Sequence, residues 1–250
     1  MISLKSPREI ALMKEAGRIV ALVHAKMREV VKPGISTLEL DRIAEEVIRS
    51  NGATPSFKGY QGFPNAICTS INDMLVHGIP DHTILKDGDI ISIDVGACYK
   101  GYHGDSAWSY VVGEVKDPKI LDLMKVTEEA LYVGLAQVKP GNRVGDIAHA
   151  IQTYVEDHGY STPIEYTGHG IGRNVHEDPA IPNVGEANTL QVLKKGMCIA
   201  VEPMVFMGKP HCYTLKDGWG VKSRDGSLAA HYEHTVAITE DGYEIMTKED

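Results

Sequence analysis

The chain has 250 residues, of which 43% are hydrophobic and 24% charged, and this composition excludes a disordered or collagen-like protein. Surface scaling predicts about 10,900 Å² of exposed surface after folding, which leaves enough buried area for one sizeable core. The 34 acidic residues outnumber the 25 basic ones, and no basic stretch occurs. We therefore expect no stable nucleic-acid partner and no membrane partner, because nucleic acids and anionic membranes are bound through clustered Lys and Arg.

The sequence indicates a cytoplasmic protein. No apolar run approaches the roughly 18 residues of a membrane span. The first residues include charges and a proline where a signal peptide needs an apolar segment. The four cysteines form no CxxC pair, so they are expected to be reduced thiols, as is usual in that compartment.

The predicted helices follow from a repeated pattern. The sequence VKPG at 31–34 recurs at 138–141. Because Pro and Gly do not continue a helix, each copy is expected to end one, over about 7–31 and 118–137. An amphipathic segment that ends in a glycine follows each copy. The chain is therefore expected to contain an internal duplication.

A second match between the halves predicts strands that carry acids. Residues 85–94 align with residues 193–202, and in both a turn with Gly leads into a β-branched run that is typical of a strand. Each run ends in a carboxylate, Asp94 or Glu202. A later predicted strand in each half opens with a further acid, Asp105 and Glu233. Small residues share the face of each acid, so the four carboxylates are expected to converge on one inner face.

These patterns predict an α+β fold made of two α-α-β halves, an N-terminal half at about 7–112 and a C-terminal half at about 118–246. The halves are expected to be related by a pseudo-twofold axis, with a central antiparallel sheet and the helices outside. No linker separates them, so we expect a single domain over 1–250, with extra loops around 207–228.

The converging acids predict a metal centre. Any one of them alone could be an exposed acid at a strand end, but four carboxylates on one face repel each other unless protons or cations neutralise them. A site for two metal ions satisfies this requirement. His169, in the glycine-rich sequence GHGIG at 168–172, is a fifth candidate ligand, because alternating glycines let the backbone approach a crowded centre.

The remaining histidines are assigned more simply. His77 and His176 are candidates for proton transfer, although each could be an ordinary loop histidine. His103 and His231 precede Asp105 and Glu233 by two residues and are weaker alternative ligands, whereas His234 points to the other face. The others are expected to be solvated: His24, His82, His149, His158 and His211.

Five motifs resemble those of type I methionine aminopeptidases, and the resemblance extends from about residue 4 to 246. They are IDVG at 93–96, YHGD at 102–105, GHGIG at 168–172, VEPM at 201–204 and YEHT at 232–235. That family has the pita-bread fold, in agreement with the two halves predicted above. The chain resembles the short bacterial form.

The resemblance implies a dinuclear metal site. It implies that Asp94 and Asp105 chelate or bridge the ions. His169 and Glu202 would complete the ligands of one ion, and Glu233 would bridge both ions. The ions proposed for the family are Fe(II), Mn(II) or Co(II), and an oxygen-rich site with one imidazole is compatible with all three.

The implied reaction is removal of the N-terminal methionine from peptides and nascent proteins with a small second residue. Water activated by the two ions attacks the methionine carbonyl carbon, with Glu202 as the proton acceptor. His77 and His176 would contact the scissile amide and the tetrahedral intermediate. The methionine side chain is expected to lie among four residues, Tyr60, Phe63, Cys68 and Trp219.

Two positions depart from the family pattern. Gln61 stands where many relatives carry His, and Val175 replaces a frequent Phe, which is expected to widen the methionine pocket. By the same resemblance, we expect a monomer that acts on nascent chains near the ribosome.

The fold leaves two alternative functions open. The first is a related pita-bread hydrolase such as an Xaa-Pro aminopeptidase, and the second is a catalytically inactive binding module of the same fold. Related prolidases usually carry an additional N-terminal domain, and inactive relatives tend to lose metal ligands. All five implied ligands are present here.

Overall fold

Each half of the chain begins with two helices. The computed structural model describes residues 2–248, so residues 1, 249 and 250 of the expected domain lie outside the described part. The helices are α1 (Pro7–Val30), α2 (Thr37–Ser50), α3 (Pro118–Leu135) and α4 (Val144–Asp157). The helices predicted over about 7–31 and 118–137 are confirmed, and the amphipathic segments that follow VKPG are also helical.

Local sequence explains where these helices begin and end. At the start of α1, the Ser6 side chain accepts a hydrogen bond from the Glu9 N–H, and the Glu9 carboxylate accepts one from the Ser6 N–H. Just beyond α1 and α3, Gly34 and Gly141 both have a φ of 94°, a conformation that glycine adopts without strain. The repeated VKPG sequence thus turns the chain by the same geometry in both halves.

The N-terminal half contains an antiparallel sheet built around two long strands. Strand β4 (Ile90–Tyr99) pairs with β5 (Tyr102–Val111), with β2 (Ile67–Ile71) and with the short β1 (Thr54–Pro55). The β4–β5 register places Asp94 opposite Ala107 and Gly96 opposite Asp105. The two aspartates are therefore diagonal neighbours on one face of the sheet.

The C-terminal half contains a five-stranded antiparallel sheet with the order β14-β13-β8-β6-β7. Its strands are β6 (Thr167–Gly170), β7 (Glu177–Pro182), β8 (Cys198–Val201), β13 (His234–Ile238) and β14 (Tyr243–Ile245). Glu202 directly follows β8, and Glu233 directly precedes β13. Asp105, in contrast, lies inside β5 rather than at its start, where the sequence had suggested it.

Five short strands form two smaller sheets, one of which includes strands of both halves. They are β3 (Met74–Val76), β9 (Met204–Phe206), β10 (Cys212–Thr214), β11 (Val221–Ser223) and β12 (Ala229–His231). The segment 207–228 was expected to be only loops, but it contains β10 and β11, and β11 pairs with β3 of the other half. These strands are three residues long, too short for a periodic pattern in the sequence to reveal them.

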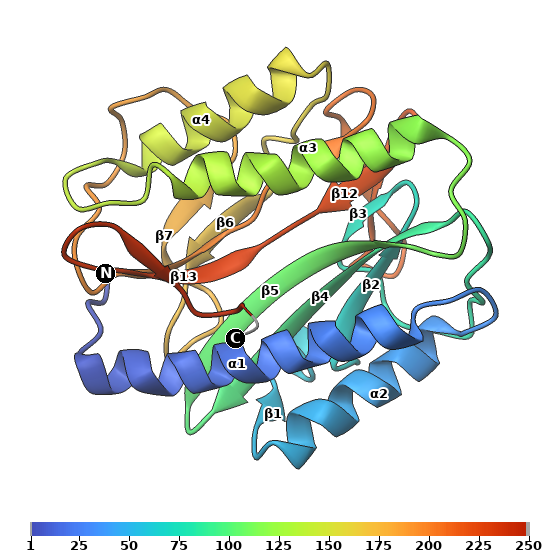
Figure 1. Ribbon diagram of the computed structural model, residues 1–250, viewed down its shortest axis with the longest axis horizontal. Coiled ribbons are helices and arrows are strands. Elements are labelled where there is room, and N and C mark those ends of the chain that lie inside the picture. Colours follow the sequence, from blue (N-terminus) through green and yellow to red (C-terminus); the bar gives the residue numbers. More distant parts are fainter. Residues whose placement is uncertain (1, 249–250) are drawn as a thin grey trace.

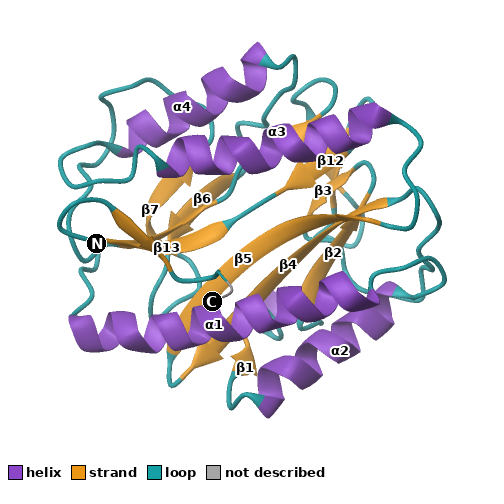
Figure 2. Cartoon of the chain, viewed as in Figure 1, coloured by secondary structure: helices purple, strands orange, loops and turns teal. Residues whose placement is uncertain are grey.

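The helices flank the strands in two pairs (Figures 1 and 2). Helices α1 and α2 lie along one side, α3 and α4 along the other, and β5 and β13 lie next to each other between them. One apolar cluster lies between α1, α2 and the N-terminal sheet, and a second between α3, α4 and the C-terminal sheet. Trp108 packs against both clusters. The exposed surface of 10836 Å² agrees with the area expected from chain length.

The prediction that His24 is solvated is wrong, because its side chain is buried. It lies on the packed face of α1 with Val20 and Met27. Its Nε2 donates to the Ser106 carbonyl oxygen at 2.9 Å, and its Nδ1 lies 2.7 Å from the Tyr110 hydroxyl. Burial lowers the pKa of His24 to about 3, so its ring is neutral. Its helical spacing from Val20 was the available signal.

The structure also bears on the cysteines and on possible membrane-spanning helices. The four cysteines are free thiols, as expected. Within residues 2–248, no helix combines the length and apolarity that a membrane crossing requires.

We expect Gly17→Ala to destabilise the fold. A Cβ atom at Gly17 would lie 2.1 Å from the Met246 carbonyl oxygen, where α1 crosses the C-terminal segment. Alanine gains about 1 kcal/mol in helix propensity, but overpacking against backbone costs up to about 3 kcal/mol. The net loss expected in urea unfolding is about 1–2 kcal/mol. Gly242→Ala, whose Cβ meets nothing within 4 Å, is the control and should change stability by less than about 0.5 kcal/mol. Equal stability of wild type and Gly17→Ala would contradict the tight crossing.

Candidate metal centre and substrate pocket

Hydrogen bonds between the halves hold two of the acids in place. The Glu233 N–H donates to the Ala107 carbonyl at 2.8 Å, and the Ser106 hydroxyl donates to the Glu233 carbonyl at 2.6 Å. Thr235 Oγ1 donates to the Asp105 carbonyl at 2.7 Å and accepts from the Asp105 N–H at 3.1 Å. This set of contacts, which we call the seam, fixes Asp105 of β5 beside Glu233 at the start of β13.

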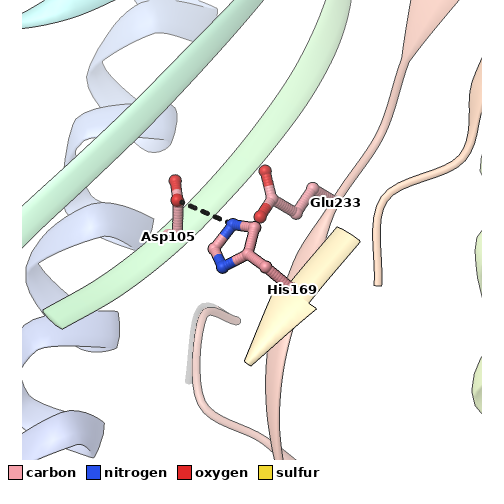
Figure 3. A group of neighbouring side chains, drawn as sticks. All are labelled: Asp105, His169 and Glu233. Carbon is pink, nitrogen blue, oxygen red and sulfur yellow. Dashed lines mark ion pairs between the residues drawn. The ribbon is translucent and has the colours of Figure 1, made fainter. Parts of the chain in front are cut away.

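His169 points into the space between the acids. Its Nε2 lies 3.7 Å from Asp105 Oδ2 and 3.5 Å from Glu202 Oε1. Figure 3 shows Asp105 on β5, His169 on β6 and Glu233 on the segment just before β13, with their side chains gathered in one place. His169 Nδ1 lies 2.9 Å from the Gly170 carbonyl, which can only accept, so Nδ1 carries the proton. Nε2 therefore presents its lone pair to the acids, as a metal ligand would.

Burial makes the group of acids electrostatically unfavourable on its own. It raises the pKa of Asp94 to about 6, and burial together with the charges of Asp94 and Glu202 raises the pKa of Asp105 well above its usual value. The pKa values of Glu202 and Glu233 are also raised well above normal, chiefly by burial. Burial lowers the pKa of His169 to about 3, which keeps this ring neutral. The region therefore favours bound positive charge.

The donor atoms fit divalent cations. Among the described residues, Asp94 Oδ1, Asp105 Oδ1, Glu233 Oε1 and His231 Nε2 are buried without a hydrogen-bond partner. Buried polar atoms are rarely left in this state, because it costs free energy. Two overlapping triads place their ligand atoms within 4.8 Å of one another: Asp105, His169 and Glu233, and Glu202, His231 and Glu233. Carboxylate oxygens with imidazole nitrogens suit first-row divalent ions.

The structure gives His231 more weight than the sequence did. The sequence predicts His231 and His103 only as weaker alternatives to the five main candidate ligands. His231 lies inside the site, whereas His103 turns away and contacts Ser56 Oγ at 2.8 Å. Both precede an acid by two residues, so spacing alone could not separate them.

A cavity of about 360 Å³ opens beside the acids. Its walls include the four predicted pocket residues, Tyr60, Phe63, Cys68 and Trp219. Gln61 also lines it, in a left-handed conformation with a φ of 48°. Val175 is buried behind Phe63 and Cys68, so its effect on the pocket acts through their packing. Residues missed by sequence reasoning also line the cavity, among them Phe57, Tyr166 and Met204.

His77 and His176 both reach this cavity. His176 Nδ1 lies 3.0 Å from the Tyr60 hydroxyl, and its ring centroid is 4.2 Å from that of His169. The His77 ring lies 6.3 Å from the Trp219 ring, and burial lowers its pKa to about 4. The structure thus brings together all of the catalytic, ligand and pocket residues named from the sequence.

A fold of two helix-flanked sheets with buried acids between them defines a metal-dependent hydrolase. The sequence profile of metallopeptidase family M24 matches residues 11–240, and the chain belongs to that family. Methionine aminopeptidase 1 of Bacillus subtilis is 56% identical over 248 residues, which cover 99% of this chain and 100% of the relative. Within the family the chain groups with the methionine aminopeptidases.

Solved structures agree with this placement. The methionine aminopeptidase of Thermotoga maritima superposes with a TM-score of 0.98 at 45% identity and covers 100% of both chains. The Xaa-Pro dipeptidase of Bacillus anthracis is more distant, with a TM-score of 0.80, 27% identity and 62% of its length covered. The pita-bread fold expected from the sequence is confirmed.

We expect Glu233→Gln to stabilise the metal-free protein at neutral pH. Because the folded pKa of Glu233 is raised above 4.5, the folded state binds its proton more tightly than the unfolded chain. Its contribution to stability is therefore present at acid pH and lost as the pH rises through the folded pKa. Glutamine removes this penalty and should raise the free energy of unfolding of the chelated protein by about 1–3 kcal/mol.

The measurement is urea unfolding of chelator-treated protein between acid and neutral pH. The variant should show a flatter dependence on pH than wild type, and a smaller stabilisation when Mn(II) is added. Glu186→Gln, an exposed acid, is the control and should match wild type. A less stable Glu233→Gln protein at neutral pH would contradict the electrostatic account.

Proposed function

We propose that the chain removes the N-terminal methionine from peptides and nascent proteins at a centre of two divalent ions. The observation that carries this proposal is the convergence of three buried carboxylates, the half-buried Asp94 and His169 on one cavity. The similarity of the chain to methionine aminopeptidases supports the substrate class. The alternative of an Xaa-Pro hydrolase is less well supported, because those relatives are more distant and longer.

Five residues would hold the ions. Asp105 and Glu233, which the seam holds together, and Asp94 on the neighbouring strand would chelate or bridge, while His169 and Glu202 would complete one ion. Mn(II), Fe(II) and Co(II) all accept such oxygen-rich donor sets. The presence of all five side chains argues against an inactive binding module.

Bound divalent ions would lower the pKa of a water molecule and polarise the scissile carbonyl. Glu202 would accept the proton of that water and deliver it to the leaving amine, because its carboxylate lines the cavity beside the other acids and His169. When the Tyr60 hydroxyl donates to His176 Nδ1, the His176 Nε2–H is free to donate to the substrate. His77, which lines the cavity near Trp219, would donate to the developing oxyanion or to the scissile amide.

The cavity would select the first residue of the substrate. Tyr60, Phe63 and Trp219 give an apolar surface for the methionine side chain, and Cys68 offers a thiol near the thioether. The acids would attract the free α-amine, so only an N-terminal residue fits. A small second residue would be preferred, as in the family.

The remaining features extend this proposal. The two halves, at about 7–112 and 118–246, would be an internal duplication within a single catalytic domain. The protein would act as a cytoplasmic monomer on nascent chains near the ribosome, without stable nucleic-acid or membrane contacts.

We expect Met-Ala-Ser to lose its first residue in the presence of Mn(II) or Co(II). A chelator should abolish turnover, and re-addition of metal should restore it, because the chemistry requires the ions. Release of methionine, followed by chromatography, is the measurement. Acetyl-Met-Ala-Ser, which lacks the free amine, is the matched control and should not be cleaved. No cleavage with any of the candidate metals would contradict the proposal.

A second experiment should distinguish metal ligands from proton-transfer residues by the metal content and the kcat of their variants. Asp105→Ala and Glu233→Ala are expected to lose both ions, because each would bridge them. His176→Ala should keep two ions but lose about 10²–10⁴-fold in kcat, as is typical for an acid–base group. Metal analysis and peptide kinetics on the same samples test this, with the exposed His211→Ala as control. Two bound ions in either bridge variant would refute the assignment.

A further inference from the structure

His231 lies buried inside the site, and its backbone is anchored by residues of both halves. It is the last residue of β12 and pairs with Met204 of β9, which follows closely after Glu202. Its backbone N–H donates to Ser109 Oγ at 3.0 Å, and its carbonyl accepts from the same hydroxyl at 3.1 Å. Only 1% of its surface is exposed. The backbone of His231 is therefore anchored by Ser109, and its side chain is enclosed by the fold.

The position of its ring is closely comparable to that of His169. His231 Nε2 lies 3.2 Å from Glu202 Oε2 and 4.0 Å from Glu233 Oε2. For comparison, His169 Nε2 lies 3.5 Å from Glu202 Oε1 and 3.7 Å from Asp105 Oδ2. Ligands that lie about 2.0–2.2 Å from one ion are separated by about 3–4 Å from each other. Both rings therefore satisfy the spacing for a shared ion.

The contact between His231 and Glu202 is close without being a hydrogen bond. Despite the 3.2 Å separation, Nε2 has no hydrogen-bond partner among residues 2–248, and it is fully buried. Glu202 thus lies between two imidazoles, with Oε1 toward His169 and Oε2 toward His231. An ion placed between Glu202 and Glu233 would give the Nε2 lone pair a partner.

We propose that His231 is a sixth protein ligand, which supplies a second imidazole to an ion shared by Glu202 and Glu233. The inference rests on the proposed dinuclear centre and adds a ligand to it. A second nitrogen donor favours later first-row ions over Mn(II), because imidazole binds those ions more strongly than oxygen does. The chain would therefore bind Co(II) more tightly, relative to Mn(II), than a site with one imidazole.

The test compares wild type with His231→Gln, which keeps a polar side chain but removes the imidazole. Chelated protein is titrated with Co(II) and with Mn(II) by calorimetry, and the visible spectrum of the Co(II) form is recorded. We expect at least about a tenfold loss of Co(II) affinity for one ion, a smaller loss for Mn(II), and a changed Co(II) spectrum. His24→Gln removes another buried imidazole, away from the site, and should leave metal affinity unchanged.

A second measurement on wild type does not depend on a variant. Protein labelled in the histidine ring nitrogens is loaded with Zn(II), and nitrogen NMR counts the coordinated imidazoles. Two coordinated rings support the proposal, and a single one overturns it. Unchanged affinity and spectrum in a folded His231→Gln protein would also overturn it. Wild type that binds no divalent ion would instead contradict the proposed function itself.

Discussion

Four carboxylates share one buried face, and the rest of the architecture accommodates their mutual repulsion. Like charges in a region of low dielectric must be protonated or matched by cations, and burial raises the pKa of all four groups. The β4–β5 register leaves little apolar side chain beside the two aspartates, because Asp94 faces Ala107 and Asp105 faces Gly96, where a side chain would collide with Phe57. The fold instead obtains its stability from the two apolar clusters beneath the helices, away from the site.

The seam holds the two halves together without placing apolar side chains among the acids. It joins the halves through backbone groups and small hydroxyl side chains rather than through bulky apolar residues. Ser106, Ser109 and Thr235 satisfy the polar backbone atoms of the strands that carry the acids. The carboxylates are consequently left without competing partners and are available to ligands, which is the condition for preorganised metal binding.

Much of the site was predictable from the sequence, because the duplication marks it twice. Asp94 matches Glu202, and Asp105 matches Glu233, so symmetry supplied evidence that no single acid could. His24 was misassigned, since its neighbours Tyr110 and Ser106 become contacts only after the helix packs on β5. His231 and His103 have the same spacing from an acid, and only the strand register separates them. Strands β10 and β11 pair with a distant strand, so local pattern did not predict them.

The seam also has a consequence for biosynthesis. Asp94 and Asp105 leave the ribosome well before Glu202 and Glu233, and neither pair can form the centre alone. A chain interrupted before Glu233 could build the first sheet and its two helices, yet it would lack one of the four acids and the strand that orders Asp105. An incomplete chain would therefore lack both Glu233 and the Thr235 contacts that hold Asp105, so the complete group of acids forms only when synthesis has nearly finished.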